Sequence, residues 1–166
     1  MLSTLLAACR GGQQTASTPA PHAADPGWFT DIAQASGLDV VHFNGMSGEY
    51  YYPEIMAPGL ALLDYDNDGD LDVYVVQGQM LGGKPVTAAT FPPTGPLRDR
   101  LFRNDLDPVM HAVHFTDVTD RSRIDVRSYG MGVAVGDIDN DGRVDVYRTG
   151  LTGSVILGWG VVIWRV

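Results

Sequence analysis

Two short segments of the chain place aspartates at alternate positions around a glycine. The first, DYDNDGDLD, begins at Asp64, and the second, DIDNDGRVD, begins at Asp137. Calcium takes about six to eight oxygen ligands, and carboxylates at alternate positions of a tight loop can turn toward one ion. Without an ion, carboxylates held so close together would repel each other and raise one another's pKa. Each segment therefore predicts a loop that binds calcium, with about two ions in all.

The predicted ligands occupy every second position of each loop, and a glycine in the middle permits the sharp bend. The fourth ligand position offers its backbone carbonyl, and the other four offer carboxylates. The metal-ligand candidates are Asp64, Asp66, Asp68, Asp70 and Asp72 in the first loop, and Asp137, Asp139, Asp141, Arg143 and Asp145 in the second. Magnesium fits this set less well, because it prefers a smaller octahedral shell that keeps several waters.

Two other readings of these segments compete with a structural calcium loop. An EF-hand loop begins in the same way but needs a glutamate at its twelfth position, where this chain has Val75 and Arg148. Its flanking helices are also not indicated, because the neighbouring residues have the pattern of strands. A solvated acidic turn of an ordinary hairpin would explain Asn-Asp-Gly alone. It does not explain why four spaced aspartates recur.

The acidic loops belong to a longer internal repeat. FTDIAQASGLDV at 29–40 returns as FTDVTDRSRIDV at 115–126, an offset of 86 residues, and GLALLDYDNDGDLDVY at 59–74 returns as GVAVGDIDNDGRVDVY at 132–147, an offset of 73. The same two elements therefore occur twice in the same order. The first copy has about 13 extra residues between them, near HFNGMSGEYYYPEI, which we expect to form a loop or an additional hairpin.

Short apolar runs bounded by glycine and aspartate predict an all-β fold. None of them shows the longer apolar periodicity of a helix. The expected strands are 60–63, 71–76, 101–105, 133–135 and 144–147, together with the two FTD segments at 29–31 and 115–117. The stretch 82–96, GGKPVTAATFPPTGP, is rich in glycine and proline and predicts a long exposed loop.

Composition and motifs argue against two classes of function. The chain has 166 residues, 45% of them apolar, and a net charge of −9, so it lacks the cationic surface that nucleic acid binding requires. The histidines stand singly at His22, His42, His111 and His114, and no nucleophile elbow, zinc-protease motif or phosphate-binding loop is present. We therefore expect neither nucleic acid binding nor enzymatic activity.

The amino terminus resembles the end of a bacterial lipoprotein signal. An apolar stretch leads to Cys9, the only cysteine in the chain, and is followed by a segment rich in Gly, Gln, Ser, Thr, Ala and Pro. Residues 1–9 are thus expected to be a signal remnant lipidated at Cys9, and 10–26 a flexible tether. The protein would then be exported, either lipid-anchored in the cell envelope at the outer membrane or surface, or secreted. The alternative is an apolar terminus with an ordinary thiol.

The two motif copies resemble the FG-GAP/VCBS repeats. The longer stretch from GLDVVHFNG to VYVVQG, with LFRND and YGMGVAVGD, resembles more narrowly the cartilage acidic protein group, whose longer members often carry an ASPIC/UnbV module. The resemblance implies four-stranded β-propeller blades with calcium in the loop between two strands. It covers 27–147, divided into a first repeat at 27–100 and a second at 101–147. Arg123 departs from it, because the first copy has Gly37 there.

After Tyr147 the repeat pattern stops. The remaining residues, 148–166, form an atypical apolar tail without acidic residues, and its apolar part at 151–164 is too short to cross a hydrocarbon core of roughly 30 Å. We expect a truncated or frame-shifted end, so that the chain holds about two blades of an incomplete propeller and the remaining blades are missing. A propeller closes with about four to eight blades.

These observations favour a non-catalytic calcium-binding module of an exported, surface-anchored protein that mediates adhesion or ligand binding. The alternative is the propeller portion of a larger secreted enzyme whose catalytic domain lies outside this chain. The binding partner, a protein or a glycan, is not identified by the sequence. Contact with a membrane would come only through the lipid at Cys9.

Overall fold

The computed structural model describes residues 28–158 and the backbone of 161–165. The chain forms two compact units, Met1–Asp31 and Ile32–Val166. Only residues 28–31 of the first unit are described, and the side chains of Trp28 and Phe29 are exposed there. The predicted signal remnant, Cys9 and the tether lie outside the described residues.

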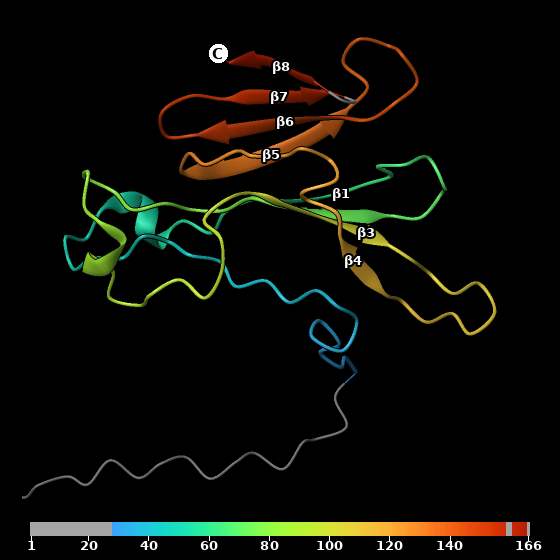
Figure 1. The fold of residues 1–166 in the computed structure, drawn as a ribbon, viewed down its shortest axis with the longest axis horizontal. Coiled ribbons are helices and arrows are strands. Elements are labelled where there is room, and N and C mark those ends of the chain that lie inside the picture. The colour runs from blue at the N-terminus through green and yellow to red at the C-terminus, as the bar shows by residue number, and fades with distance from the viewer. Residues whose placement is uncertain (1–27, 159–160, 166) are drawn as a thin grey trace, which may run out of the picture. The chain divides into compact units, whose positions relative to one another are not determined.

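The second unit contains two four-stranded antiparallel sheets (Figure 1). The first sheet has the order β1 (Leu60–Leu63), β2 (Asp72–Val75), β3 (Arg100–Asn104) and β4 (Phe115–Asp117). The second has the order β5 (Gly130–Gly136), β6 (Asp145–Gly150), β7 (Val155–Gly158) and β8 (Val161–Arg165). Each sheet is a simple meander, because every strand pairs with the next one along the chain. The all-β prediction is confirmed, and the described strands are consistent with propeller blades but do not close a barrel.

Most of the expected strands are present, and one expected strand is absent. The FTD segment at 115–117 forms β4, whereas its copy at 29–31 forms no strand. The extra residues of the first copy form a loop with the 3-10 helix η1 (Tyr52–Ile55), which is the first of the two expected alternatives, and not the additional hairpin. Pro53 fixes its own backbone and removes a donor, which favours a short turn of helix over a paired strand. The loop 82–96 contains one more 3-10 turn, η2 (Val86–Ala88).

The sheets divide the chain differently from the sequence repeats. Strand β3 pairs with β2 and β4 pairs with β3, so both belong to the first sheet, although the repeat pattern assigned 101–147 to the second repeat. Strand β6 crosses the expected boundary at Tyr147, and β7 and β8 come from the apolar tail. Short runs rich in Val and Ile suit a pleated, half-buried surface whatever motif they belong to, so the tail completes the second sheet.

The two sheets meet along β1 and β5. The Gly59 N–H, just before β1, donates to the Met131 carbonyl in β5 at 3.1 Å. A Cβ at Gly59 would lie only 2.8 Å from the Val133 nitrogen, so glycine permits this close approach. The apolar core between the sheets consists of Ala61, Leu63, Tyr74, Val76, Leu101, Val118 and Val146. Both sheets therefore share one core.

A buried ion pair also joins the sheets. Arg148 of β6 donates from Nε to Asp99 Oδ2 at 3.0 Å, and neither side chain is exposed to solvent. The Tyr74 hydroxyl donates to the same carboxylate at 2.8 Å. Burial and the Asp99 carboxylate raise the pKa of Tyr74, so its hydroxyl remains a donor. Arg148 further donates to the Ser128 hydroxyl at 2.6 Å, so the buried charges are paired and hydrogen-bonded.

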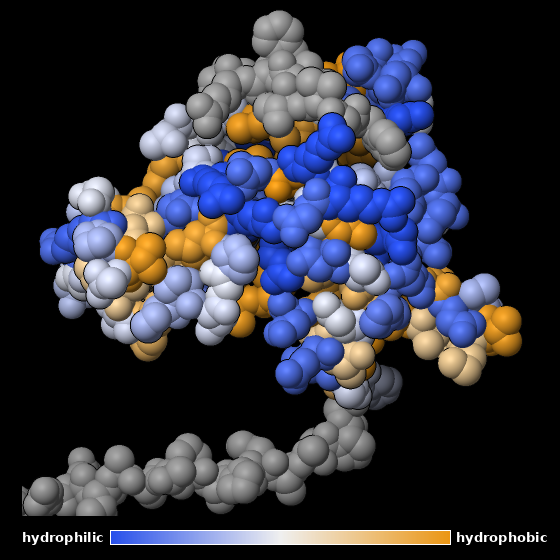
Figure 2. Space-filling view, in the orientation of Figure 1, coloured by the Kyte–Doolittle hydropathy of each residue, from blue (hydrophilic) through white to orange (hydrophobic). Residues whose placement is uncertain are grey.

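The surface is mostly hydrophilic on the face shown in Figure 2, and apolar side chains break it over the loops with η1 and η2. The exposed apolar and aromatic side chains of these loops include Tyr50, Tyr52, Ile55 and Phe91. No helix among the described residues has the length and apolar content needed to cross a membrane.

Candidate metal-binding loops

Each acidic segment forms the loop between the first two strands of a sheet. In the first sheet Leu63 pairs with Asp72 across the start of the loop, and in the second Gly136 pairs with Asp145. The last aspartate of each segment is thus the first residue of a strand. Pairing of the strands brings it back beside the aspartate that opens the loop.

The two loops have the same backbone conformation. Asn67 and Gly69 have φ of 61° and 93°, and the matching Asn140 and Gly142 have φ of 60° and 83°. Asparagine and glycine are the residues that tolerate this left-handed region best. The conformation of the loop is therefore a property of its sequence.

The opening aspartate of each loop is held by backbone donors of the same loop. The Asp64 carboxylate accepts from the Asp68 and Gly69 N–H groups, both at 3.1 Å. The Asp137 carboxylate accepts from the Asp141 and Gly142 N–H groups at 3.0 and 2.9 Å. These bonds fix the direction of the carboxylate before any ion is bound.

Three of the predicted ligands come together in each loop. One carboxylate oxygen each from Asp64, Asp66 and Asp72 lies within 4.8 Å of the others. The same holds for the matching triad of Asp137, Asp139 and Asp145. Three carboxylate oxygens at such spacing can contact one hard cation at the usual calcium distance of about 2.3 to 2.6 Å.

The other predicted ligands lie outside these triads. The Asp68 carboxylate accepts from the Asp70 N–H at 2.9 Å, and the Asp141 carboxylate accepts from the Arg143 N–H at 2.9 Å. These two carboxylates therefore stabilise the loop backbone by accepting hydrogen bonds from it. Asp70 and Arg143 were predicted to ligate through their backbone carbonyls, and this stays a prediction.

Burial makes the first triad electrostatically costly. Asp72 is fully buried, and its pKa is raised by burial and by repulsion from Asp66 and Asp68, although the N–H groups of Asn104 and Tyr65 oppose the rise. Burial and the neighbouring carboxylates also raise the pKa of Asp66. A bound cation would remove this penalty, because it favours the charged form of every carboxylate around it.

One atom of the first loop points specifically to a missing ligand. The Oδ1 atom of Asp66 is buried and has no hydrogen-bond partner among the described residues. An unpartnered buried carboxylate oxygen is unfavourable, and the few cases in folded proteins call for an explanation such as an ion. The donor set consists of hard oxygens, which is what calcium requires. The residues of the first loop therefore fit a calcium ion.

The second triad lies closer to solvent. The side chains of Asp137 and Asp139 are exposed, and only Asp145 is buried, with 4% of its surface accessible. Asp145 accepts from the Ile138 N–H at 2.9 Å, just as Asp72 accepts from the Tyr65 N–H at 2.6 Å. The loop geometry is thus repeated, and its surroundings are not.

Asn104, at the end of β3, supports the first loop and was not expected to do so. Its N–H donates to Asp72 Oδ1 at 2.7 Å, and its side-chain Oδ1 is buried without a partner among the described residues. The LFRND segment was predicted only as a strand. Because Asn104 is 32 residues from Asp72 in sequence, only the pairing of β2 with β3 reveals the contact.

Comparison with known families agrees with this architecture. The family described as FG-GAP-like repeat matches residues 64–147, half of the chain. The match begins at the first residue of the first acidic loop and includes the whole of the second. No curated protein matches the chain significantly.

Proposed function

The chain belongs to the FG-GAP-like repeat family, and on that premise we propose that it is a calcium-binding, non-catalytic repeat module. One observation carries the proposal: the chain has two carboxylate triads, 73 residues apart in sequence, on loops of the same conformation. Within each triad, one oxygen from each carboxylate lies within 4.8 Å of the others. A single acidic cluster is common on protein surfaces. Two acidic clusters in the same structural position indicate that both serve the same purpose, which we propose is calcium binding.

Calcium would act here as part of the structure. In each loop the triad joins the beginning of the loop to the first residue of the next strand. An ion bound to all three carboxylates ties the two strands together and stabilises the folded state by its binding free energy. Because β2 and β6 both contribute to the shared core, the ions would also hold the junction of the two sheets.

The module would be exported and would present its loops for adhesion or ligand binding, to a protein or a glycan. The arguments are the lipobox-like segment before Cys9, the tether 10–26 and the exposed aromatic side chains on the η1 and η2 loops. The resemblance of the motifs to the cartilage acidic protein group agrees with an extracellular role.

Calorimetry with and without calcium tests the central claim. At a free calcium concentration of about 100 times the Kd of each site, calcium binding adds about 2.7 kcal/mol per site to the free energy of unfolding. For a domain of this size, two sites should raise the melting temperature by about 10 °C or more. Titration calorimetry should report two calcium ions per chain.

The control is a chain with both opening aspartates replaced, Asp64→Asn with Asp137→Asn. Each substitution removes the charge but keeps one side-chain oxygen, so that one of the two loop N–H groups bound by each aspartate retains its acceptor. This variant should lose most of the calcium effect and still fold in calcium-free buffer. A melting temperature that does not change between calcium and chelator in the original chain would refute the proposal.

A further inference from the structure

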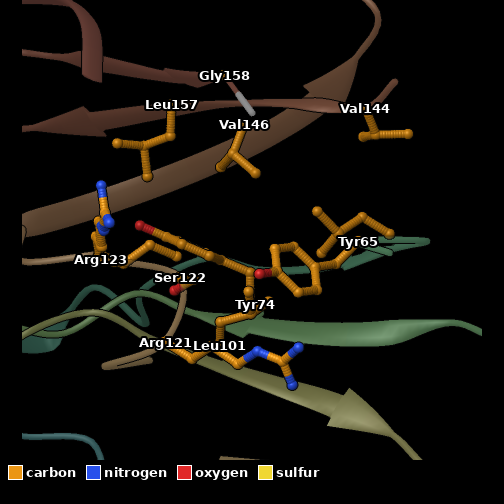
Figure 3. A pocket seen from close by; sticks show the side chains of 12 residues that line it. Tyr65, Tyr74, Leu101, Arg121, Ser122, Arg123, Val144, Val146, Leu157 and Gly158 are labelled. Atoms are coloured by element: carbon orange, nitrogen blue, oxygen red, sulfur yellow. The ribbon is translucent and has the colours of Figure 1, made fainter. Parts of the chain in front are cut away.

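A cavity of about 250 Å³ lies between the two sheets. Its walls come from both of them: Leu63, Tyr74 and Leu101 from the first, and Val146 and Leu157 from the second. Tyr65 and Val144, which belong to the two acidic loops, complete the lining on one side (Figure 3). The cavity is therefore a gap in the shared core that both sheets must be present to form.

The interior of this cavity is mainly apolar and aromatic. The Tyr74 ring forms part of the wall, while its hydroxyl is used by Asp99. Apolar cavities of about 150 Å³ in proteins bind benzene, and most ligand pockets range from about 300 Å³ upward. A volume near 250 Å³ thus suits a flat apolar body of one or two rings.

Two cationic side chains border the cavity on the segment after β4. Arg121 and Arg123 are both exposed, and neither has an ion pair or a side-chain hydrogen bond among the described residues. In Figure 3 the Arg123 side chain stands at the end of the cavity opposite Val144. On a chain with a net charge of −9, unpaired guanidinium groups beside an apolar cavity are a local exception.

Arg123 has an unfavourable backbone conformation, and the equivalent turn in the first copy of the repeat serves as the reference for it. The turn at 118–123 has the same bonds as the turn at 32–37: Ser122 N–H donates to Val118 O at 2.8 Å, as Ser36 N–H donates to Ile32 O. The residue that closes the turn is Gly37 in one copy, with φ of 90°, and Arg123 in the other, with φ of 60°.

Glycine suits such a position, and an arginine there costs free energy. Strained residues of this kind persist where the surroundings determine them, and they gather at ligand sites. Here the residue with the unfavourable conformation is one whose side chain lines the cavity. This links the departure of Arg123 from the repeat to the cavity beside it.

From these observations we propose that the cavity binds a small carboxylic acid with a flat apolar body. The apolar body enters between Leu101, Val146 and Leu157, and Arg123 binds the carboxylate at the rim. Guanidinium and carboxylate groups form strong charge-assisted hydrogen bonds, and few fixed polar groups beside an apolar cavity give orientation and selectivity. Arg121 supplies a second positive charge near the rim.

The probe for the experiment is 2-naphthoate, with the uncharged 2-naphthalenemethanol as its match. Both are titrated into the full chain in calcium-containing buffer, with heat or intrinsic ligand fluorescence as the readout. We expect saturable 1:1 binding of 2-naphthoate and binding of the alcohol weaker by about tenfold or more, because a hydrogen bond to a charged group is the stronger kind.

The decisive variant is Arg123→Gly. It restores the glycine of the other copy, so the turn is relieved of strain and the protein should fold at least as well as the original chain. It should weaken the binding of 2-naphthoate about tenfold or more and leave the affinity for the alcohol unchanged. Arg127→Gln is the matched control, because Arg127 is exposed, pairs with Asp125 and does not line the cavity.

A second variant tests the cavity itself. Val144→Phe places a larger side chain in the gap and should abolish binding of both compounds while the melting temperature stays the same or rises, because the substitution fills an existing cavity. The proposal is overturned if 2-naphthoate shows no saturable binding. It is also overturned if Arg123→Gly leaves the affinity for 2-naphthoate unchanged, or if the alcohol binds as well as the acid, which would make the gap an unspecific apolar void.

Discussion

The two acidic loops share a sequence pattern and a backbone conformation, yet their surroundings differ. In the first loop Asp72 is fully buried, accepts two backbone N–H groups and lies against β3. In the second, Asp137 and Asp139 are exposed, and Arg143 replaces Asp70. A local motif thus determines the shape of its loop, while the neighbouring strands determine how much it costs to leave the loop without an ion.

Two further positions separate the copies. Val75 of the first repeat corresponds to Arg148 of the second, and Gly37 corresponds to Arg123. In both cases the second copy carries an arginine that meets the first sheet or the cavity between the sheets. The repeats therefore differ where the two sheets meet. The following experiments make the two copies alike, or unlike, at chosen positions.

The largest effect is expected from Arg148→Val, which gives the second repeat the residue of the first. The substitution leaves the Asp99 carboxylate buried without its cation, and breaking one side of a buried ion pair costs about 3 to 5 kcal/mol. Urea unfolding followed by circular dichroism measures the loss.

A double-mutant cycle separates the lost pair from lost packing. Adding Asp99→Asn to Arg148→Val removes the stranded charge, so the double variant should be more stable than the sum of the single effects predicts. Simple additivity of the two losses would contradict the view that this pair couples the two sheets.

The second-largest loss of stability is expected when the buried aspartate of each loop is replaced by alanine. In calcium-free buffer Asp72→Ala leaves the Tyr65 and Asn104 N–H groups without their acceptor and should cost about 3 kcal/mol. Asp145→Ala removes the acceptor of the Ile138 N–H and should cost about 1.5 kcal/mol. Equal losses from the two variants would show that β3 adds nothing to the first loop.

A smaller effect of opposite sign is expected from Arg123→Gly, which makes the two turns alike. Relief of the left-handed conformation is offset in part by the greater freedom of glycine in the unfolded chain, so we expect a gain of about 0.5 to 1 kcal/mol. Thermal unfolding measures it.

Gly37→Ala is the reciprocal change in the first turn. Its Cβ would lie 2.3 Å from the Phe115 carbonyl oxygen, so this variant should be clearly destabilised. If Arg123→Gly were destabilising as well, the equivalence of the two turns would be wrong.

The smallest effect is a pH dependence of the calcium-free protein. Burial raises the pKa of Asp72 and Asp66 in the folded chain above the unfolded value of about 4. Between the unfolded and the folded pKa the folded state binds more protons at these two groups, so their contribution to stability should rise as the pH falls through the folded pKa toward about 4. Urea unfolding at several pH values measures this slope.

The Asp72→Asn variant should show a smaller slope, because it no longer takes up that proton. Asp139→Asn serves as the reference, since that side chain is exposed. With calcium bound the sign should reverse, because the ion requires charged carboxylates and acid releases it. Equal slopes for the original calcium-free chain and Asp72→Asn would contradict the raised pKa of Asp72.

Much of the fold could be predicted because short-range patterns determine it. The strand at 60–63 is a short apolar run bounded by glycine and aspartate, and Asn67 and Gly69 supply the left-handed residues of the turn. The same patterns could not predict that 29–31 forms no strand, because its sequence equals that of β4. A strand needs a partner, and partners are a property of the whole chain.

The candidate site was predictable to the same extent. The alternate spacing predicted ten ligand positions, and six of them come together as the triads Asp64, Asp66, Asp72 and Asp137, Asp139, Asp145. Asn104, whose N–H holds Asp72, was not predicted as part of the site, because its contact depends on strand pairing over 32 residues. The cavity beside Arg123 was likewise not predicted, since it exists only between two packed sheets.

The sequence by itself determined most strands of the two repeats, the conformation of the two loops and the carboxylates that could face an ion. These depend on backbone preferences and residue spacing within about ten residues. The tertiary structure alone decided which loop is buried, which arginine pairs with Asp99 and where the sheets leave a cavity. Burial and charge pairing depend on atoms that are distant in sequence, and only packing brings those atoms together.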